Sequence, residues 1–196
     1  MASEKSDMQI VVIGDHNVGK STLIHSYFTH NFSDAQIPSI RERYTFQDHS
    51  TETPKQVEII DTLGMKVFEH DRQRAYAQAD VIVLCFSVAN PDSFKNVSKV
   101  WWKEIKRYAR KVPVILVGNK ADKYEVEDSQ ERECLIMPDR AKRLKGSLDF
   151  YKYISCSARK NYNIHKVFQV ALEACYSKGS KSTKPKRKFC CMGISC

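Results

Sequence analysis

The sequence predicts an α/β fold in which helices cover a mostly parallel sheet of six strands. Short apolar runs alternate with helix-like stretches along the 196 residues. Two of the runs, Val81–Phe86 and Val112–Val117, are apolar throughout, which is typical of strands buried on both faces of a parallel sheet. The glycine-rich segment Gly14–Ser21 directly follows the first run, where ligand loops lie in such sheets. These three observations carry the prediction.

Six runs are expected to form strands. The polar segment His49–Thr53 separates two of them, which predicts an antiparallel hairpin at one edge of the sheet. The others are separated by helix-like stretches, so crossover connections are expected to leave them parallel. The expected strands are Met8–Ile13, Arg43–Gln47, Gln56–Ile60, Val81–Ser87, Val112–Val117 and Tyr151–Ser155.

About five helices are expected between and after these strands. The final one places apolar residues on one face, which is typical of an amphipathic helix packed on a sheet. Trp101 and Trp102 are neighbours on the third helix and point about 100° apart, so one is expected to pack inward and the other to be partly exposed. The expected helices are Lys20–His30, Lys66–Ala79, Asp92–Arg110, Asp139–Lys145 and Asn163–Ser177.

The net charge of +9 belongs mainly to the C-terminal segment. From Ser177 onward there are six basic residues and no acidic residue, which leaves +3 for the rest of the chain. A basic tail beside cysteines favours an anionic membrane surface, whereas a basic body would favour nucleic acid, so no nucleic-acid partner is expected. The six residues are Lys178, Lys181, Lys184, Lys186, Arg187 and Lys188.

We therefore expect a flexible N-terminus over residues 1–7, a globular domain over 8–177 and a basic, cysteine-containing tail over 178–196. No apolar run approaches membrane-spanning length, and the first residues lack an apolar signal region. A cytoplasmic protein is expected, peripheral at the cytoplasmic face of the plasma membrane or of an internal membrane. The seven cysteines are expected to be reduced thiols, and no metal-ligand spacing is seen among Cys and His.

Residues Gly14–Ser21, GDHNVGKS, match the phosphate-loop pattern G-x-x-x-x-G-K-[ST] between an expected strand and an expected helix. Glycines allow a tight turn in which successive N–H groups point at one anion. Lys20 would reach the outer phosphates, and the Ser21 hydroxyl would bind Mg²⁺. A glycine-punctuated turn is the alternative interpretation. The residues expected to contact phosphate are Asp15, His16, Asn17, Val18, Gly19, Lys20, Ser21 and Thr22.

Three further segments follow expected strands. In Asp61–Gly64, the aspartate could hold Mg²⁺ through a water, and the Gly64 N–H could approach the terminal phosphate. In Asn119–Asp122, the Asp122 carboxylate can accept hydrogen bonds from both the ring N–H and the amino group of guanine. The backbone of Ser155–Ala158 could receive the guanine oxygen. Each segment alone fits an ordinary turn, but all of them in order, each after a strand, indicate a guanine-nucleotide site on a P-loop NTPase fold.

On these residues the chain resembles the Ras-like small GTPases over about residues 7–177, and within them the Rho family. Pro91–Val117 is similar to the Rho stretch before the guanine motif. The span from Asn119 to Ser157 is longer than in Ras or Rab proteins, and its excess, Tyr124–Met137, resembles a shortened Rho insert helix. A charged surface helix is the plain interpretation of that segment, and the two interpretations are compatible.

The resemblance implies GTP or GDP as ligand, Mg²⁺ as cofactor and a monomer. It implies that Phe32 stacks on the guanine, with a core phenylalanine as an equal alternative, and that Ser39 contacts Mg²⁺ and the γ-phosphate. Switch I would be Gln36–Tyr44 and switch II Thr62–Tyr76, ordered by the γ-phosphate and presented to effector proteins. Guanine-nucleotide exchange factors and a GDP-dissociation inhibitor are further implied partners. The guanine-binding residues implied are Phe32, Asn119, Lys120, Asp122, Ser157, Ala158 and Arg159.

The chain departs from the family pattern at its catalytic positions. Met65 stands where the family has the glutamine that orients the attacking water, and a thioether cannot donate a hydrogen bond. His16 and Asn17 stand where small residues leave room for an arginine finger, and Leu63 replaces a small alanine. Our hypothesis is therefore tight GTP binding with slow hydrolysis, as in Rnd-like Rho proteins. The catalytic set is Lys20, Ser39, Gly64 and the substituted Met65.

Three alternatives remain open for activity. His16 could position the water and allow normal cycling, or the chain could be a GTP-locked binding module with essentially no turnover. A P-loop kinase for a small metabolite is a third alternative, disfavoured because it needs no guanine reader. The resemblance implies effectors that act on actin, adhesion or trafficking.

The tail also departs from the family pattern. A prenylated Rho protein has cysteine fourth from its end, and Gly193 occupies that position here, so standard prenylation is not expected. The cysteine pair beside the basic cluster could take another lipid, and the basic residues could bind an anionic leaflet reversibly. A solvated tail or a nuclear-import signal is the alternative. The lipidation candidates are Cys190, Cys191 and Cys196.

Overall fold

A computed structural model describes residues 6–32, 42–125 and 129–180 of the chain. Six strands form one sheet in the order β2-β3-β1-β4-β5-β6. Only the β2–β3 pair is antiparallel, so the predicted parallel sheet with one antiparallel edge strand is confirmed. The strands are β1 (Met8–Gly14), β2 (Arg43–Asp48), β3 (Lys55–Asp61), β4 (Val81–Ser87), β5 (Val114–Asn119) and β6 (Lys152–Ser155).

The first strand lies at the centre of the sheet. Ile10 of β1 pairs with Ile59 of β3 on one side and with Val81 of β4 on the other. The chain therefore crosses to opposite sides of β1, and the carboxyl end of such a strand is where open α/β sheets bind ligands. That end is Gly14, the first residue of the phosphate-loop motif.

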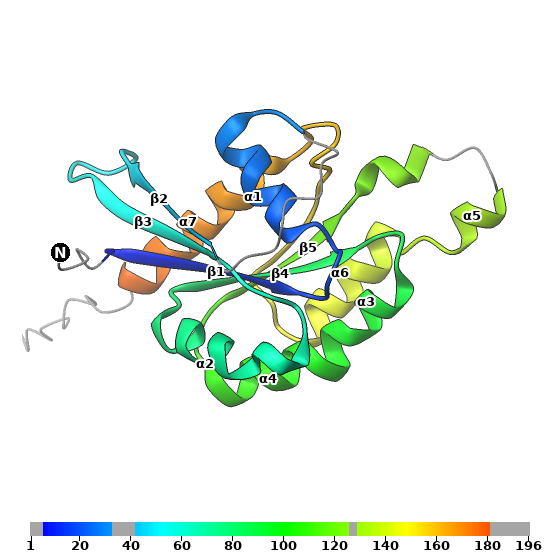
Figure 1. Cartoon of the computed structure of the whole chain (residues 1–196), viewed down its shortest axis with the longest axis horizontal. Helices are drawn as coiled ribbons and strands as arrows, with labels where there is room; N and C mark the ends of the chain where they lie inside the picture. The colour runs from blue at the N-terminus through cyan, green and yellow to red at the C-terminus, as the bar shows by residue number, and fades with distance from the viewer. Residues whose placement is uncertain (1–5, 33–41, 126–128, 181–196) are drawn as a thin grey trace, which may run out of the picture.

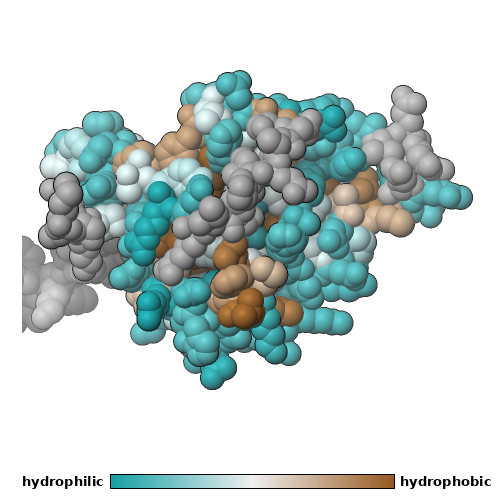
Figure 2. Space-filling model, viewed as in Figure 1, coloured by the Kyte–Doolittle hydropathy of each residue, from teal (hydrophilic) through white to brown (hydrophobic). Residues whose placement is uncertain are grey.

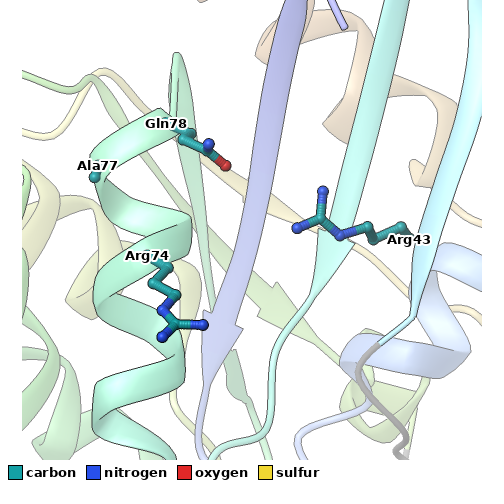
Figure 3. Close-up of a pocket in the computed structure, with 4 residues that line it drawn as sticks. All are labelled: Arg43, Arg74, Ala77 and Gln78. Carbon is teal, nitrogen blue, oxygen red and sulfur yellow. The ribbon is translucent and has the colours of Figure 1, made fainter. Parts of the chain in front are cut away.

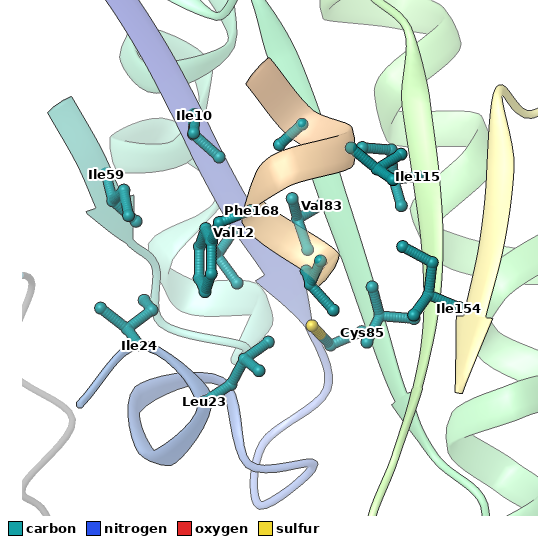
Figure 4. Close-up of a cluster of buried hydrophobic side chains, with 14 of the residues drawn as sticks. Ile10, Val12, Leu23, Ile24, Ile59, Val83, Cys85, Ile115, Ile154 and Phe168 are labelled. Carbon is teal, nitrogen blue, oxygen red and sulfur yellow. The ribbon is translucent and has the colours of Figure 1, made fainter. Parts of the chain in front are cut away.

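Helices cover both faces of the sheet (Figure 1). On one face lie α1 (Lys20–Thr29) and α7 (Ile164–Ser180), whose apolar residues join one core cluster. Figure 4 shows Leu23, Val83, Ile115 and Phe168 converging in that cluster. The opposite cluster is covered by α2 (Glu69–Gln78), α3 (Pro91–Asn96), α4 (Trp102–Tyr108) and α6 (Pro138–Ser147). Most of the coloured surface on the side viewed in Figure 2 is hydrophilic.

The third predicted helix is one rod in three parts. A π-helical segment, η2 (Val97–Trp101), joins α3 to α4 without a break. Trp101 is buried in the second core cluster while Trp102 is partly exposed, so the predicted division of the two indoles is confirmed. A π turn adds a residue to the helical cycle and is frequent at functional sites.

Several boundaries differ from those predicted, for local physical reasons. Pro113 has no N–H to donate, so the fifth strand begins at Val114. The second predicted helix begins with a 3₁₀ turn, η1 (Lys66–Phe68), before α2 starts at Glu69. The predicted insert contains the short helix α5 (Ser129–Glu133), which projects from the body at the right of Figure 1, and follows the 3₁₀ turn η3 (Ala121–Glu125).

The ends of the described domain are tied to its body. Asp7 exchanges hydrogen bonds with Gln56, which extends the pairing of β1 with β3. Tyr176 of α7 donates its hydroxyl to Asp48 at the end of β2. Within the described ranges the cysteines, Cys85, Cys134, Cys156 and Cys175, are free thiols, as predicted. No helix in that part of the chain is long and apolar enough to span a bilayer.

Candidate functional site

The phosphate loop turns tightly over the end of β1 because glycine occupies its two most crowded positions. Gly14 has φ +139°, and a Cβ there would lie 2.1 Å from the Cys85 carbonyl oxygen. Gly19 has φ +93°, and a Cβ there would lie 2.5 Å from the Asn119 side-chain nitrogen. No other residue fits either position without displacing backbone or the neighbouring amide. The two glycines of the motif are thus explained by packing as well as by phosphate access.

Lys20 begins α1 and is buried beneath the loop. Its ammonium donates to the carbonyl oxygens of Gly14 at 3.0 Å and Asp15 at 2.8 Å. Burial removes water from this cation and lowers the pKa of Lys20, while the nearby Asp61 carboxylate opposes that shift. An anion in the loop would supply the charge that the buried ammonium lacks.

Ser21 and Asp61 meet where a magnesium site is predicted. The Ser21 hydroxyl donates to Asp61 Oδ2 at 2.5 Å, and Oδ1 of the same carboxylate is buried with no hydrogen-bond partner in the described part of the chain. Burial raises the pKa of Asp61. A hydroxyl and an unsatisfied carboxylate oxygen are hard ligands suited to Mg²⁺, which keeps several waters and takes its other ligands from phosphates. The residues therefore fit the ion, and no cluster of three ligating side chains exists in the described ranges to hold it alone.

The side chain of Asp15 is held away from the loop interior. Its carboxylate accepts hydrogen bonds from Trp101 Nε1 at 2.6 Å and from Asn96 at 2.7 Å. Val18 is fully buried in the core, so Asp15 and Val18 can serve a phosphate only through their backbone N–H groups. His16 and Asn17 are exposed on the outer side of the loop, and Thr22 is half-buried in α1.

The first predicted guanine motif lies against the same loop. The Asn119 amide donates to the carbonyl oxygens of Val18 at 3.0 Å and Gly19 at 3.1 Å. Lys120 donates to the Asn17 carbonyl oxygen at 2.7 Å. These contacts join segments about a hundred residues apart, so the loop and the base-reading segment form one unit.

The last motif completes this edge of the sheet. The Ser157 hydroxyl donates to Asp122 Oδ1 at 2.5 Å, which orients the carboxylate that would read the base. Ala158 is buried and Arg159 is exposed beside it. Phe32 is an exposed side chain at the edge of the described ranges. Predicted site residues outside those ranges are Ser39, the switch I residues 36–41, and Cys190, Cys191 and Cys196.

The segment after β3 rests directly on the phosphate loop. The Thr62 hydroxyl donates to the Val12 carbonyl oxygen at 2.8 Å. A Cβ at Gly64 would lie 2.5 Å from the Gly14 carbonyl oxygen and 2.6 Å from the His16 nitrogen. Gly64 is therefore positioned beside the loop as predicted from its motif, and only glycine permits so close an approach.

A buried arginine that sequence reasoning missed holds the next residues. Arg72 of α2 donates to the carbonyl oxygens of Leu63 and Met65, each at 2.8 Å. It also forms a two-pronged ion pair with Glu104 of α4, at 2.7 and 3.0 Å, and Tyr76 donates to the same carboxylate at 2.9 Å. We call Arg72, Tyr76 and Glu104 the switch II clamp. The sequence feature that could have indicated this contact is Glu104, because a carboxylate beside the inward-facing positions Trp101 and Ile105 needs a buried basic partner.

The clamp also lies next to the residue that holds Asp15. The guanidinium of Arg72 lies over the Trp101 ring at 5.0 Å from its centroid. The face of the Trp101 indole ring thus contacts Arg72, and the N–H at the ring edge donates a hydrogen bond to Asp15. The phosphate loop and the segment Leu63–Met65 are consequently fixed to the same α3–η2–α4 rod.

A separate cavity of about 660 Å³ lies between α2 and the β2 edge of the sheet. Figure 3 shows the guanidinium groups of Arg43 and Arg74 on its two sides, with Ala77 and Gln78 on α2. Arg43 is paired with Glu58 at 2.8 Å. None of the phosphate-loop or guanine-motif residues lines this cavity, so it is not part of the predicted site.

Comparison with known proteins agrees with this geometry. A family model described as "Ras family" matches residues 9–177. The chain is 35% identical over 174 residues to the GTP-binding protein RHO4 of Saccharomyces cerevisiae, in an alignment that covers 87% of this chain. The chain spans 58% of the length of that relative.

Proposed function

The chain belongs to the Ras family of small GTPases, within which it is of the Rho type, and on this basis we propose that it is a GTP-dependent molecular switch with slow hydrolysis. One observation supports the site most strongly. Four motifs that are distant in sequence follow β1, β3, β5 and β6, and hydrogen bonds join the phosphate loop to Asn119, Ser21 to Asp61, and Asp122 to Ser157.

In this proposal each residue has a physical role. The loop amides and Lys20 bind the phosphates, and Asp122 selects guanine by accepting two hydrogen bonds. Ser21, Ser39 and a water held by Asp61 would hold Mg²⁺, which would supply positive charge to neutralise the phosphates. The Gly64 N–H approaches the γ-phosphate, as its contact with the loop backbone allows.

Slow hydrolysis is proposed because binding and catalysis depend on different residues. Met65 is 48% exposed, and its backbone carbonyl is bound by Arg72. Its thioether cannot donate a hydrogen bond to a water and accepts one only weakly. His16 and Asn17, exposed on the loop, would occupy the approach of an arginine finger. A subtype like the Rnd proteins follows from these substitutions.

A GTP-locked module with essentially no turnover is the extreme form of this proposal. The switch II clamp favours it, because Arg72 holds Leu63 and Met65 through contacts within the protein. Normal cycling would instead require a substitute for the missing glutamine, for which the exposed His16 is the candidate.

The proposed partners are those of Rho-type switches. Effectors and exchange factors would contact switch I and switch II, where Met65 and Val67 expose apolar surface to them. A GDP-dissociation inhibitor is a further candidate partner. The basic tail would hold the protein at an anionic membrane from the cytoplasm, with Cys190, Cys191 or Cys196 as lipid attachment sites. Roles in actin or membrane signalling follow from the Rho type.

The bound nucleotide tests turnover and base choice together. Protein purified in Mg²⁺ buffer without added activator is expected to carry mostly GTP, because hydrolysis is slow relative to purification. Denaturation followed by ion-exchange chromatography identifies the nucleotide. Predominant GDP would contradict slow hydrolysis, and the absence of any guanine nucleotide would contradict the site.

The Met65→Gln variant tests the catalytic substitution. A glutamine amide can orient the attacking water, so single-turnover phosphate release is expected to accelerate on the order of tenfold to a hundredfold. Met65→Leu is the matched control, since it keeps size and apolarity and should leave the rate unchanged. Equal rates for Met65→Gln and wild type would assign the slow step to His16 and Asn17 instead.

A further inference from the structure

Basic side chains cover the outward face of the α3–η2–α4 rod. Residues 93–111 include seven basic residues and one acidic residue. The acidic one, Glu104, is buried and bound to Arg72 and Tyr76. We call the basic set the basic band; its members are Lys95, Lys99, Lys103, Lys106, Arg107, Arg110 and Lys111, and all seven are exposed.

Helical spacing places these cations on one side of the rod. Phe94, Val97, Trp101 and Ile105 turn inward and are buried in the second core cluster. Positions 99, 103, 106 and 107 recur between the inward ones with the spacing of one helix face, and Arg110 and Lys111 lie in the turn that follows α4.

The neighbouring helix extends the positive surface. The Arg140 guanidinium of α6 lies over the Phe94 ring at 5.3 Å, so α6 adjoins the rod, and Arg143 is exposed on the same helix. Two nearby carboxylates are already paired, Asp92 with Lys95 and Asp139 with Lys142. On the other flank, Glu69 of α2 accepts from Tyr108. Lys99, Lys103 and Arg110 have no hydrogen bond or ion pair with the described part of the chain.

We propose that the basic band is a docking surface of the folded domain for a bilayer that contains anionic phospholipid. Among the described residues 93–111, Val100 is the one exposed large apolar side chain, and none of these residues lines the cavity between α2 and β2. Protein partners rely on buried aromatic or arginine anchors in such pockets. A lipid surface needs neither, because it presents many negative charges without fixed spacing.

The course of the helices is consistent with one membrane contact for the band and the tail. Both α4 and α7 run opposite to the parallel strands, so both finish at the end of the sheet away from the nucleotide site, although they cover opposite faces of it (Figure 1). The last described residue, Ser180, therefore lies at the same end of the sheet as the end of α4. The band goes beyond the proposed function, because it belongs to the folded domain and takes part in neither nucleotide binding nor switching.

The test is co-sedimentation of the full chain with vesicles of phosphatidylcholine alone or with about a third phosphatidylserine. The band variant is Lys99→Gln, Lys103→Gln, Arg110→Gln. The control variant is Arg132→Gln, Lys152→Gln, Lys166→Gln, exposed residues outside the band with the same loss of charge. A tail variant, Lys184→Gln, Lys186→Gln, Lys188→Gln, separates the contribution of the tail. Guanine-nucleotide affinity is measured for every variant.

Wild type is expected to bind phosphatidylserine vesicles in a salt-sensitive manner and phosphatidylcholine vesicles weakly. Three cations at the surface predict that the band variant binds on the order of a hundredfold more weakly. The control should change less than threefold, and nucleotide affinity should stay constant. The proposal is overturned if the band variant binds phosphatidylserine vesicles as the control variant does, or if only the tail variant loses binding. If wild type binds no guanine nucleotide, the proposed function is contradicted, but the comparison of vesicle binding among the variants still tests the basic band.

Discussion

Replacing Asp122 with Asn is expected to change the base preference of the site from guanine to xanthine. The Asp122 carboxylate can accept hydrogen bonds from the ring N–H and the amino group of guanine. Xanthine has a carbonyl oxygen in place of that amino group, so it requires a donor, which the asparagine amide supplies. Because the Ser157 hydroxyl donates to Asp122 Oδ1 at 2.5 Å, it can still orient the asparagine oxygen.

The expected loss in GTP affinity is on the order of 10⁴-fold, since a site built to hydrogen-bond a group discriminates strongly against a mismatch. Competition of GTP and XTP against a fluorescent guanine nucleotide measures both affinities. The Asp122→Ala variant should lose affinity for GTP without gaining affinity for XTP. The Asp139→Asn variant, changed at an exposed position of α6, should keep both affinities of wild type. A preference for GTP that survives in Asp122→Asn would remove Asp122 from base recognition.

The second large effect concerns stability. Glu104→Leu would leave the Arg72 guanidinium buried without its carboxylate, and the expected loss in free energy of unfolding is about 3–5 kcal/mol. The double variant Arg72→Met, Glu104→Leu should regain much of that loss, because no unpaired charge remains buried. Denaturant unfolding at a fixed saturating nucleotide concentration measures the free energy of unfolding of wild type, of Glu104→Leu and of the double variant.

An exposed ion pair provides the control for this experiment. Lys95 and Asp92 lie 2.9 Å apart on the surface of α3, and Asp92→Asn is expected to lower the free energy of unfolding far less than Glu104→Leu does, because water solvates both charged groups. If Glu104→Leu costs no more than this control, the clamp contributes nothing particular to the fold. Arg72→Met alone should also speed amide exchange in residues 63–68, because the carbonyl groups of Leu63 and Met65 lose their donor.

Much of the fold was predictable because it follows from local patterns. Alternation of apolar and helical runs gave six strands and about five helices, and all of them are present. The polar segment after Arg43–Gln47 gave the antiparallel edge. The boundaries that shifted did so where one residue changes the hydrogen bonding, as Pro113 does before β5. The π segment at Val97–Trp101 has no signature in the apolar spacing.

The site was predictable in its motifs and less so in its contacts. The motifs predicted that Ser21 and Asp61 both serve a magnesium ion, and the two side chains are hydrogen-bonded to each other. Asp15 was predicted to contact phosphate, and its side chain binds Trp101 and Asn96, which leaves its backbone N–H for that role. The ligand-binding roles of all the predicted site residues remain predictions.

By itself the sequence determined which chemistry this protein can perform. The lysine, the hydroxyl, the two aspartates and the tightly spaced glycines on which the proposed magnesium-bound guanine nucleotide depends could all be named from their motifs, because their chemistry belongs to the residues themselves. Tertiary structure decided which residues support that chemistry. Trp101 reaches Asp15 across 86 positions, and Arg72 reaches Glu104 across 32. Such pairs depend on how the helices pack on the sheet, and only the folded chain brings their members together.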